Sequence, residues 1–245
     1  MIQIDVINSS TVLTDDQIKP MIAAVQKATR NEFAEFGAGG RPAQLNQIFK
    51  GQTPNPRHWW CAFCDDSDTA GALGYHDLTP EGGPLNKVFA KTDLTYGYEI
   101  SVTFSHEVFE QIGDPLINLV ALTADGRYEF AWENCDGTEA DEDAYVIDGV
   151  KISNFVTPRY FEDPSPSFSQ RYDYRKLVTK PFEIRPGGYL SYRDLMNPSI
   201  GWQEKRSAEK PLAGRKPVGS RTDRRRVLSK DWVRSTIFST EKSQA

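Results

Sequence analysis

The sequence contains little cysteine, little histidine and no long hydrophobic run. Its 245 residues include 3 cysteines and 3 histidines. Three cysteines are too few for a disulfide scaffold and are typical of a protein made in a reducing cytoplasm. No stretch of about 18 apolar residues is present, so no membrane-spanning helix and no membrane partner is expected. The opening MIQIDVINSS lacks the basic start and apolar core of a signal peptide, which favours a cytoplasmic site of synthesis.

The charges are unevenly distributed along the chain. The net charge is −5, but residues 204–245 hold 12 Lys and Arg against 5 Asp and Glu, a net of +7, which leaves −12 on residues 1–203. Residues 204–230 also contain few apolar residues, so they cannot form a core of their own. We therefore predict a folded domain over residues 1–203 and a basic, extended C-terminal arm over residues 204–245.

The hydrophobic periodicity predicts an α+β domain with a mixed sheet. A capping box from Thr14 to Gln17 begins a helix expected over residues 15–36, and residues 38–56 are typical of a loop with one short helical turn. A second helix is expected over residues 101–112, which Gly113 and Pro115 end. Strands are expected at residues 2–7, 57–65, 72–76 and 85–91, and shorter ones at 117–123, 127–133, 144–147 and 150–152.

Two of the cysteines form a CxxC motif whose context argues against metal or redox chemistry. Cys61 and Cys64 lie in the segment WWCAFC, which is typical of a strand. Residues three apart on a strand point to opposite faces of the sheet. We therefore expect both cysteines to be buried as small hydrophobic side chains.

The segment that carries the strongest chemical signal is SHEVFEQIGDP, residues 105–115. On a helix, His106 and Glu110 are four residues apart and share one face, where an imidazole and a carboxylate can hold a divalent metal. Glu107 would lie beside the metal and could take a proton from a bound water as general base. The alternative is a surface helix whose His106, Glu107 and Glu110 form a solvated polar face.

This helix resembles the active-site helix of the zincin metallopeptidases, with Glu110 in the place of the second histidine. The resemblance implies a zincin-like fold, in which residues 72–76 would be an edge strand able to pair with a peptide substrate. No histidine follows the helix, so a third ligand must come from His76 or from one of the acidic residues Asp114, Glu133, Asp136 and Glu139. The resemblance makes zinc the first candidate. Carboxylate ligands make the site harder than a pair of histidines would, so Mn, Ca or Mg become competitive.

The acidic stretch that follows is a second candidate. Residues 133–143 contain six carboxylates, and the bland interpretation is a solvated loop. Because the helix of His106 otherwise lacks partners, we favour a contact between it and Glu133, Asp136 or Glu139. The spacing does not match an EF-hand calcium loop.

A wider resemblance covers roughly residues 1–203. The segments SHEVFEQIGDP, WENCDGTEADEDAYVIDG, VKISNFVTPRYF and PGGYLSY resemble those of a group of uncharacterised proteins from bacteria and tailed bacteriophages. The resemblance implies a protein made in the bacterial cytoplasm and, if phage-encoded, a virion component. Its partners would be copies of itself or other virion proteins.

The arm is the third candidate, with Arg221, Arg224, Arg225, Arg226 and Trp232 as its partner-binding residues. Its charge suits an acidic neighbouring subunit, and it could also neutralise the phosphates of a nucleic acid. Our leading hypothesis is a metallopeptidase-like structural virion protein assembled through this arm. The alternatives are an active metal-dependent peptidase that uses His106, Glu110 and Glu107, and a nucleic-acid-binding protein.

Overall fold

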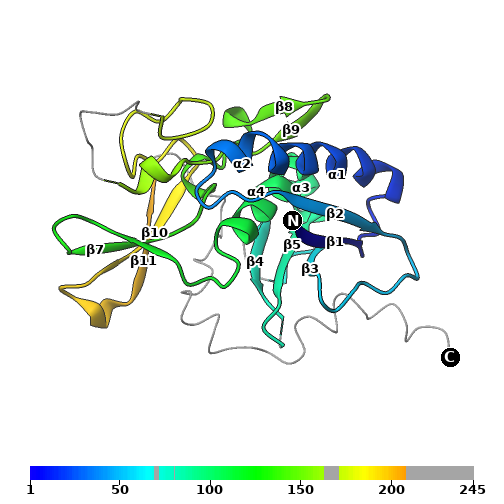
Figure 1. Cartoon of the computed structure of the whole chain (residues 1–245), viewed down its shortest axis with the longest axis horizontal. Coiled ribbons are helices and arrows are strands. Elements are labelled where there is room, and N and C mark those ends of the chain that lie inside the picture. The colour runs from blue at the N-terminus through cyan, green and yellow to red at the C-terminus, as the bar shows by residue number, and fades with distance from the viewer. Residues whose placement is uncertain (69–71, 80, 163–170, 208–245) are drawn as a thin grey trace.

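A five-stranded mixed sheet forms one half of the fold in the computed structural model, which describes residues 1–68, 72–79, 81–162 and 171–207 (Figure 1). The strand order is β2-β1-β3-β5-β4. Neighbouring strands are parallel except for β4, which pairs antiparallel with β5 at the end of the sheet. The strands are β1 (Ile2–Asn8), β2 (Ala43–Ile48), β3 (Trp59–Cys64), β4 (Gly74–Leu78) and β5 (Pro84–Phe89).

Four helices accompany this sheet, namely α1 (Asp15–Arg30), α2 (Glu32–Phe36), α3 (Ala90–Tyr96) and α4 (Ile100–Gly113). The predicted capping box is present, because the Thr14 hydroxyl accepts from the Gln17 amide and the Gln17 side chain accepts from the Thr14 amide. The backbone leaves the helical region at Asn31, with φ −112° and ψ −90°. The helix expected over residues 15–36 is therefore divided into α1 and α2.

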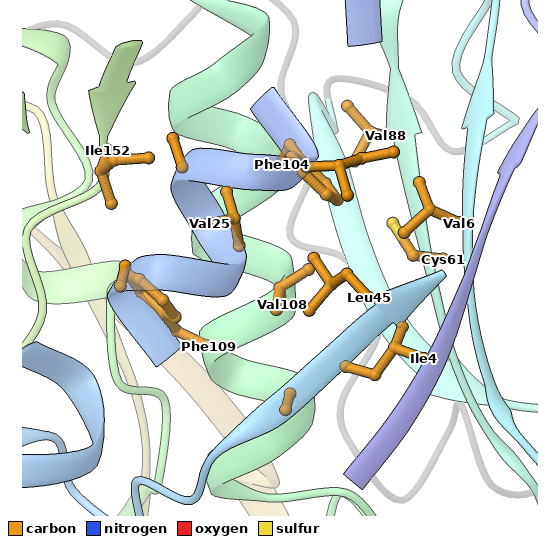
Figure 2. Close-up of a cluster of buried hydrophobic side chains, with 14 of the residues drawn as sticks. Ile4, Val6, Val25, Leu45, Cys61, Val88, Phe104, Val108, Phe109 and Ile152 are labelled. Carbon is orange, nitrogen blue, oxygen red and sulfur yellow. The ribbon is translucent and has the colours of Figure 1, made fainter. Parts of the chain in front are cut away.

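The main hydrophobic core lies where α1 and α4 pack on the same face of the sheet. In Figure 2, Val25 of α1 and Val108 of α4 lie on the helix side of this core, and Leu45 of β2 and Ile4 of β1 lie on its sheet side. Phe33, Phe109 and Phe155 form an aromatic group in this core, in which the rings of Phe33 and Phe109 stack at 4.4 Å between centroids. The core fixes the inner side of α4 and leaves its other side for polar side chains.

The two cysteines of the CxxC motif occupy opposite faces of β3, as predicted. Cys61 is buried in the main core, whereas Cys64 is buried in a second cluster that includes Tyr75 and Phe89. Both are free thiols. Burial raises the pKa of Cys64 to about 11, so the thiol is not a nucleophile near neutral pH.

The second half of the described chain contains an antiparallel sheet in the order β11-β10-β7-β6 and the hairpin β8-β9. The hairpin packs on the main core through Ile147 and Ile152. The strands are β6 (Val120–Leu122), β7 (Tyr128–Ala131), β8 (Tyr145–Ile147), β9 (Val150–Ile152), β10 (Tyr189–Asp194) and β11 (Trp202–Arg206). The short 3-10 helices are η1 (Asp136–Thr138), η2 (Asp141–Asp143), η3 (Pro158–Phe161) and η4 (Pro198–Ile200).

The α+β class and the mixed sheet agree with the sequence analysis, but three expectations need correction. Residues 43–48 form strand β2 rather than a loop, because Ala43 and Leu45 are buried beside β1. Residues 90–96 form helix α3, which was not predicted, and the strand expected over residues 85–91 ends at Phe89. Strand β11 continues to Arg206, so three residues assigned to the arm belong to the second sheet.

No helix in the described parts of the chain is long and apolar enough to cross a membrane.

Replacement of Phe109 by alanine should destabilise the protein strongly, because the ring is fully buried between Phe33 and Phe155. We expect a loss of about 3–5 kcal/mol in the free energy of unfolding, measured by denaturant titration. The matched control is Phe49→Ala, because the Phe49 side chain is 51% exposed, and it should cost no more than about 0.5 kcal/mol. Equal losses for the two variants would contradict the packing described above.

Candidate metal centre

Helix α4 is buried along its whole length, although it carries ionisable side chains. All residues from Ile100 to Gly113 are buried. The hypothesis of a surface helix with a solvated polar face is therefore wrong. Buried ionisable groups are costly unless they are paired, hydrogen-bonded or bound to a metal. The neighbours of His106, Glu107 and Glu110 must therefore provide such compensating interactions.

The predicted pair on α4 is formed, and the structure extends it to two further elements. His106 Nε2 lies 3.2 Å from Glu110 Oε1 and 3.3 Å from Oδ1 of Asp136, the first residue of η1. On the other side of Glu110, Oε2 lies 3.3 Å from Nδ1 of His76 on β4. His76 Nε2 in turn lies 3.6 Å from Oε2 of Glu133, which follows β7.

The segment Glu133–Asp136 is held on α4 by hydrogen bonds of its two middle residues. Asn134 Nδ2 donates to the carbonyl oxygen of Phe109, and the Cys135 amide donates to Glu110 Oε1 at 3.3 Å. A Cβ atom at Gly113 would lie 1.8 Å from Asn134 Nδ2. Glycine at position 113 therefore does more than end the helix, because it lets this segment approach α4 closely enough for its carboxylates to reach the histidines.

Glu107 is held between α4 and the last strand of the sheet. A Cβ atom at Gly74 of β4 would lie 2.6 Å from Glu107 Oε1 and 2.8 Å from the backbone oxygen of Lys87. Only glycine at position 74 lets the Glu107 carboxylate occupy this place under β4. Glu107 Oε2 is buried and has no hydrogen-bond partner among the described residues. One oxygen of Glu107 is thus fixed by packing, and the other has hydrogen-bonding capacity left for a ligand.

The packed charges shift the pKa values of these groups. Burial raises the pKa of Glu107 to about 8, and the charge on Glu110 adds to this while His106 opposes it. Burial likewise raises the pKa of Asp136 to about 8, assisted by Glu110. Burial disfavours a charged His106, but the Glu110 carboxylate outweighs this and raises the His106 pKa well above its ordinary value. Burial would also raise the pKa of Glu110, but His106 holds it well below its ordinary value.

The cluster opens into a cleft of about 590 Å³. Strand β4 and helix α4 form one side of it, and the segment 139–143 with β10 and β11 lines the other. The described lining contains nine carboxylates and two arginines, Arg185 and Arg206. Both arginines pair with acidic residues of the lining, Arg185 with Asp143 and Arg206 with Glu204. The cleft is therefore strongly acidic.

Three groups of side chains in the cluster could hold a metal ion. Within each group, the ligand atoms lie within 4.8 Å of one another. The groups are His106 with Glu110 and Cys135, His76 with Glu110 and Glu133, and His106 with Asp136 and Glu139. Burial raises the pKa of the Cys135 thiol well above its ordinary value, which makes it the weakest ligand of these. Two imidazoles and several carboxylates suit zinc and also harder ions such as manganese.

Most of the site residues named from the sequence meet in this cluster, but Asp114 does not. At the end of α4 its backbone leaves the helical region, with φ −134° and ψ 69°. Its carboxylate accepts hydrogen bonds from the amides of Asn118 and Leu119 and therefore stabilises the turn after α4. The arm residues Arg221, Arg224, Arg225, Arg226 and Trp232 lie outside the described residues.

Sequence reasoning missed the contributions of Gly74 and Cys135. A glycine two residues before a histidine in a predicted strand is a weak signal, because its meaning depends on the helix packed beneath it. Cys135 contributes its backbone amide, which donates to Glu110 Oε1, and its thiol is buried.

Comparison with known proteins identified no relative of this chain. No protein-family model matches the sequence, and neither a curated protein nor a solved structure shows significant similarity to it.

The stability of the metal-free protein should fall as the pH rises from about 5 to about 9. Between these values the folded protein retains protons on Glu107 and Asp136 that the unfolded chain has released, so unfolding becomes more favourable. At pH values above the ordinary pKa of a histidine, the raised pKa of His106 lowers the stability in the same way. We expect a loss on the order of a few kcal/mol, measured by denaturant titration with a chelator present.

The replacement Asp136→Asn should reduce this pH dependence, because it removes one of the groups that hold a proton in the folded state. The control Glu142→Gln changes an exposed carboxylate of the cleft and should leave the slope unchanged. A metal-free wild type whose stability rises over this range would contradict the arrangement of charges.

Proposed function

We propose that the protein is a metal-dependent hydrolase of the metallopeptidase type, with His106 and Glu110 as metal ligands and Glu107 as general base. The observation that carries the proposal is the buried cluster itself. The cluster contains five residues from three separate parts of the chain, and all of them line the cleft: His76, His106, Glu110, Glu133 and Asp136. A cluster of this composition needs a cation to offset its carboxylates.

The chemistry expected of such a centre is hydrolytic. A divalent ion held by these residues would supply Lewis acidity and lower the pKa of a bound water. Glu107 lies next to His106 in the sequence, and its buried Oε2 has no hydrogen-bond partner among the described residues. The positive charge of a bound ion would lower the pKa of Glu107, so that its carboxylate could accept a proton. His106 and Glu110 pair with each other, so the fold positions both ligands before any ion arrives.

The substrate class follows from strand β4. The amide of Phe89 donates to the carbonyl oxygen of Leu73, so in the antiparallel ladder the backbone N–H and C=O of Gly74 point away from β5. An extended peptide could pair with this side of β4 as an additional strand. Its scissile bond would then lie over Glu107, and the acidic lining favours peptides with basic residues.

The arrangement also supports the zincin-like architecture that the sequence resembles. Helix α1 follows the first strand of the mixed sheet, an antiparallel strand ends that sheet, and the helix with the HExxE motif packs beneath it. The role as a structural virion component and the binding of subunits or nucleic acid by the arm stay predictions, because residues 208–245 of the arm lie outside the described residues. In that case the same cluster would serve as a residual or structural metal centre.

The variant Glu107→Gln should lose peptide hydrolysis while it keeps its metal. Glutamine has the same shape but cannot accept the proton, so we expect a decrease in kcat of about 100-fold or more. Cleavage of a peptide mixture is followed by mass spectrometry, and bound metal by elemental analysis. Glu142→Gln, at the rim of the same cleft, is the control and should cleave as the wild type does. Wild-type protein that carries metal but cleaves no peptide would contradict the proposal.

The variant Gly74→Ala should lower activity through the position of Glu107. The new Cβ atom would overlap the Glu107 carboxylate and the Lys87 carbonyl, so the base or the strand must move. A displacement of about 1 Å can cost about 100-fold in rate, and we expect a decrease of about 10- to 100-fold in kcat with unchanged metal content.

Gly83→Ala is the matched control, because a Cβ atom there would meet Thr79 only at an ordinary distance of 3.4 Å. Equal kcat values for Gly74→Ala and the wild type would show that the place of Glu107 under β4 is unimportant.

A further inference from the structure

Two of the three ligand groups in the cluster have no residue in common. One is His76 with Glu110 and Glu133, and the other is His106 with Asp136 and Glu139. Glu110 stands between them, because it is close to both histidines. A single ion needs only one of these sets, so the presence of a second complete set requires its own explanation.

The two oxygens of Glu110 face different imidazoles. Oε2 lies 3.3 Å from His76 Nδ1, and Oε1 lies 3.2 Å from His106 Nε2. A carboxylate that presents one oxygen to each of two neighbouring ligand sets has the geometry of a bridging ligand. Centres with two metal ions about 3.5–4 Å apart use such carboxylates to hold both ions.

When all of its carboxylates are ionised, the cluster also carries more negative charge than one divalent ion can neutralise. Glu110, Glu133, Asp136 and Glu139 supply four carboxylates, and Glu107 lies beside them. One divalent ion offsets two negative charges, whereas two ions offset four. Buried carboxylates are costly without compensating charge. A second ion would therefore stabilise the carboxylates whose charge the first ion does not neutralise.

Asp136 supplies an independent observation for the set around His106. Its side chain is only 2% exposed, and its Oδ1 faces His106 Nε2. Yet Asp136 Oδ1 accepts no hydrogen bond of ordinary geometry from the described residues. A buried carboxylate oxygen directed at an imidazole nitrogen in this way is suited to share a cation with it.

We propose that the centre binds two divalent metal ions, bridged by the Glu110 carboxylate, with His76 and Glu133 holding one ion and His106, Asp136 and Glu139 holding the other. The proposal rests on the metal binding of the proposed function, but it does not depend on the reaction that the centre catalyses. Ligand sets that combine imidazole with carboxylate groups suit ions of the manganese and zinc type.

The test is the number of metal ions bound per chain. Full-length protein is freed of metal with a chelator, equilibrated by dialysis against manganese chloride, and analysed for metal and protein content. We expect two ions per chain for the wild type. Glu133→Gln and Glu139→Gln should each bind one ion, since each change weakens a different set. The control Glu142→Gln, whose side chain belongs to neither set, should still bind two.

Electron paramagnetic resonance of the manganese-loaded protein gives a second readout. Two bridged manganese ions are magnetically coupled, whereas a single ion gives the spectrum of an isolated centre. The wild type should show coupling, and Glu133→Gln and Glu139→Gln should not.

The outcomes separate this inference from the proposed function. One ion per wild-type chain with an isolated spectrum would overturn the two-metal centre and leave a one-metal hydrolase standing. No bound ion would overturn both.

Discussion

The structure depends on one electrostatic constraint, which is that carboxylates and imidazoles are gathered out of water on one side of helix α4. Glu107, Glu110, Glu133 and Asp136 are each no more than 5% exposed, as is His76. Such a group of like charges repels itself and loses hydration, so it persists only with compensating charge. When no ion is bound, the raised pKa values of Glu107 and Asp136 and the pairing of Glu110 with two histidines reduce this repulsion.

The rest of the fold holds this cluster in place. The opposite side of α4 is locked into the main core by Phe104, Val108 and Phe109, so the helix cannot turn its charged side toward water. Two glycines allow the close approach of neighbouring elements. Gly74 brings β4 down onto Glu107, and Gly113 brings the segment of Glu133 and Asp136 onto the end of α4. Rigidity on one side of the helix and close packing on the other together produce the ligand geometry.

The parts of the site that could be predicted from the sequence are those set by local spacing. His106 and Glu110 share a face because they are four residues apart on a helix, and this follows from periodicity alone. The places of His76 and Glu133 depend on the register of β4 over α4 and on the path of the chain after β7, which are long-range properties. For that reason the sequence alone could limit the third metal ligand only to a group of five candidate residues.

Asp114 shows where spacing misleads. Helical periodicity places it beside Glu110, but the helix ends one residue earlier and the carboxylate turns to the amides of Asn118 and Leu119. Strand β2 was missed for a related reason. Its segment AQLNQI has only two buried apolar residues at its start, and its strand conformation comes from parallel pairing with β1.

The central claim is that the cluster on α4 is a metal centre. The most direct measurement is a crystal structure of the full-length protein grown with manganese or zinc, with an anomalous difference map calculated from data at the absorption edge of the metal. The account predicts anomalous peaks within bonding distance of His106 Nε2 and the Glu110 carboxylate. A map without peaks there, in which the histidines and carboxylates contact only one another and water, would contradict it.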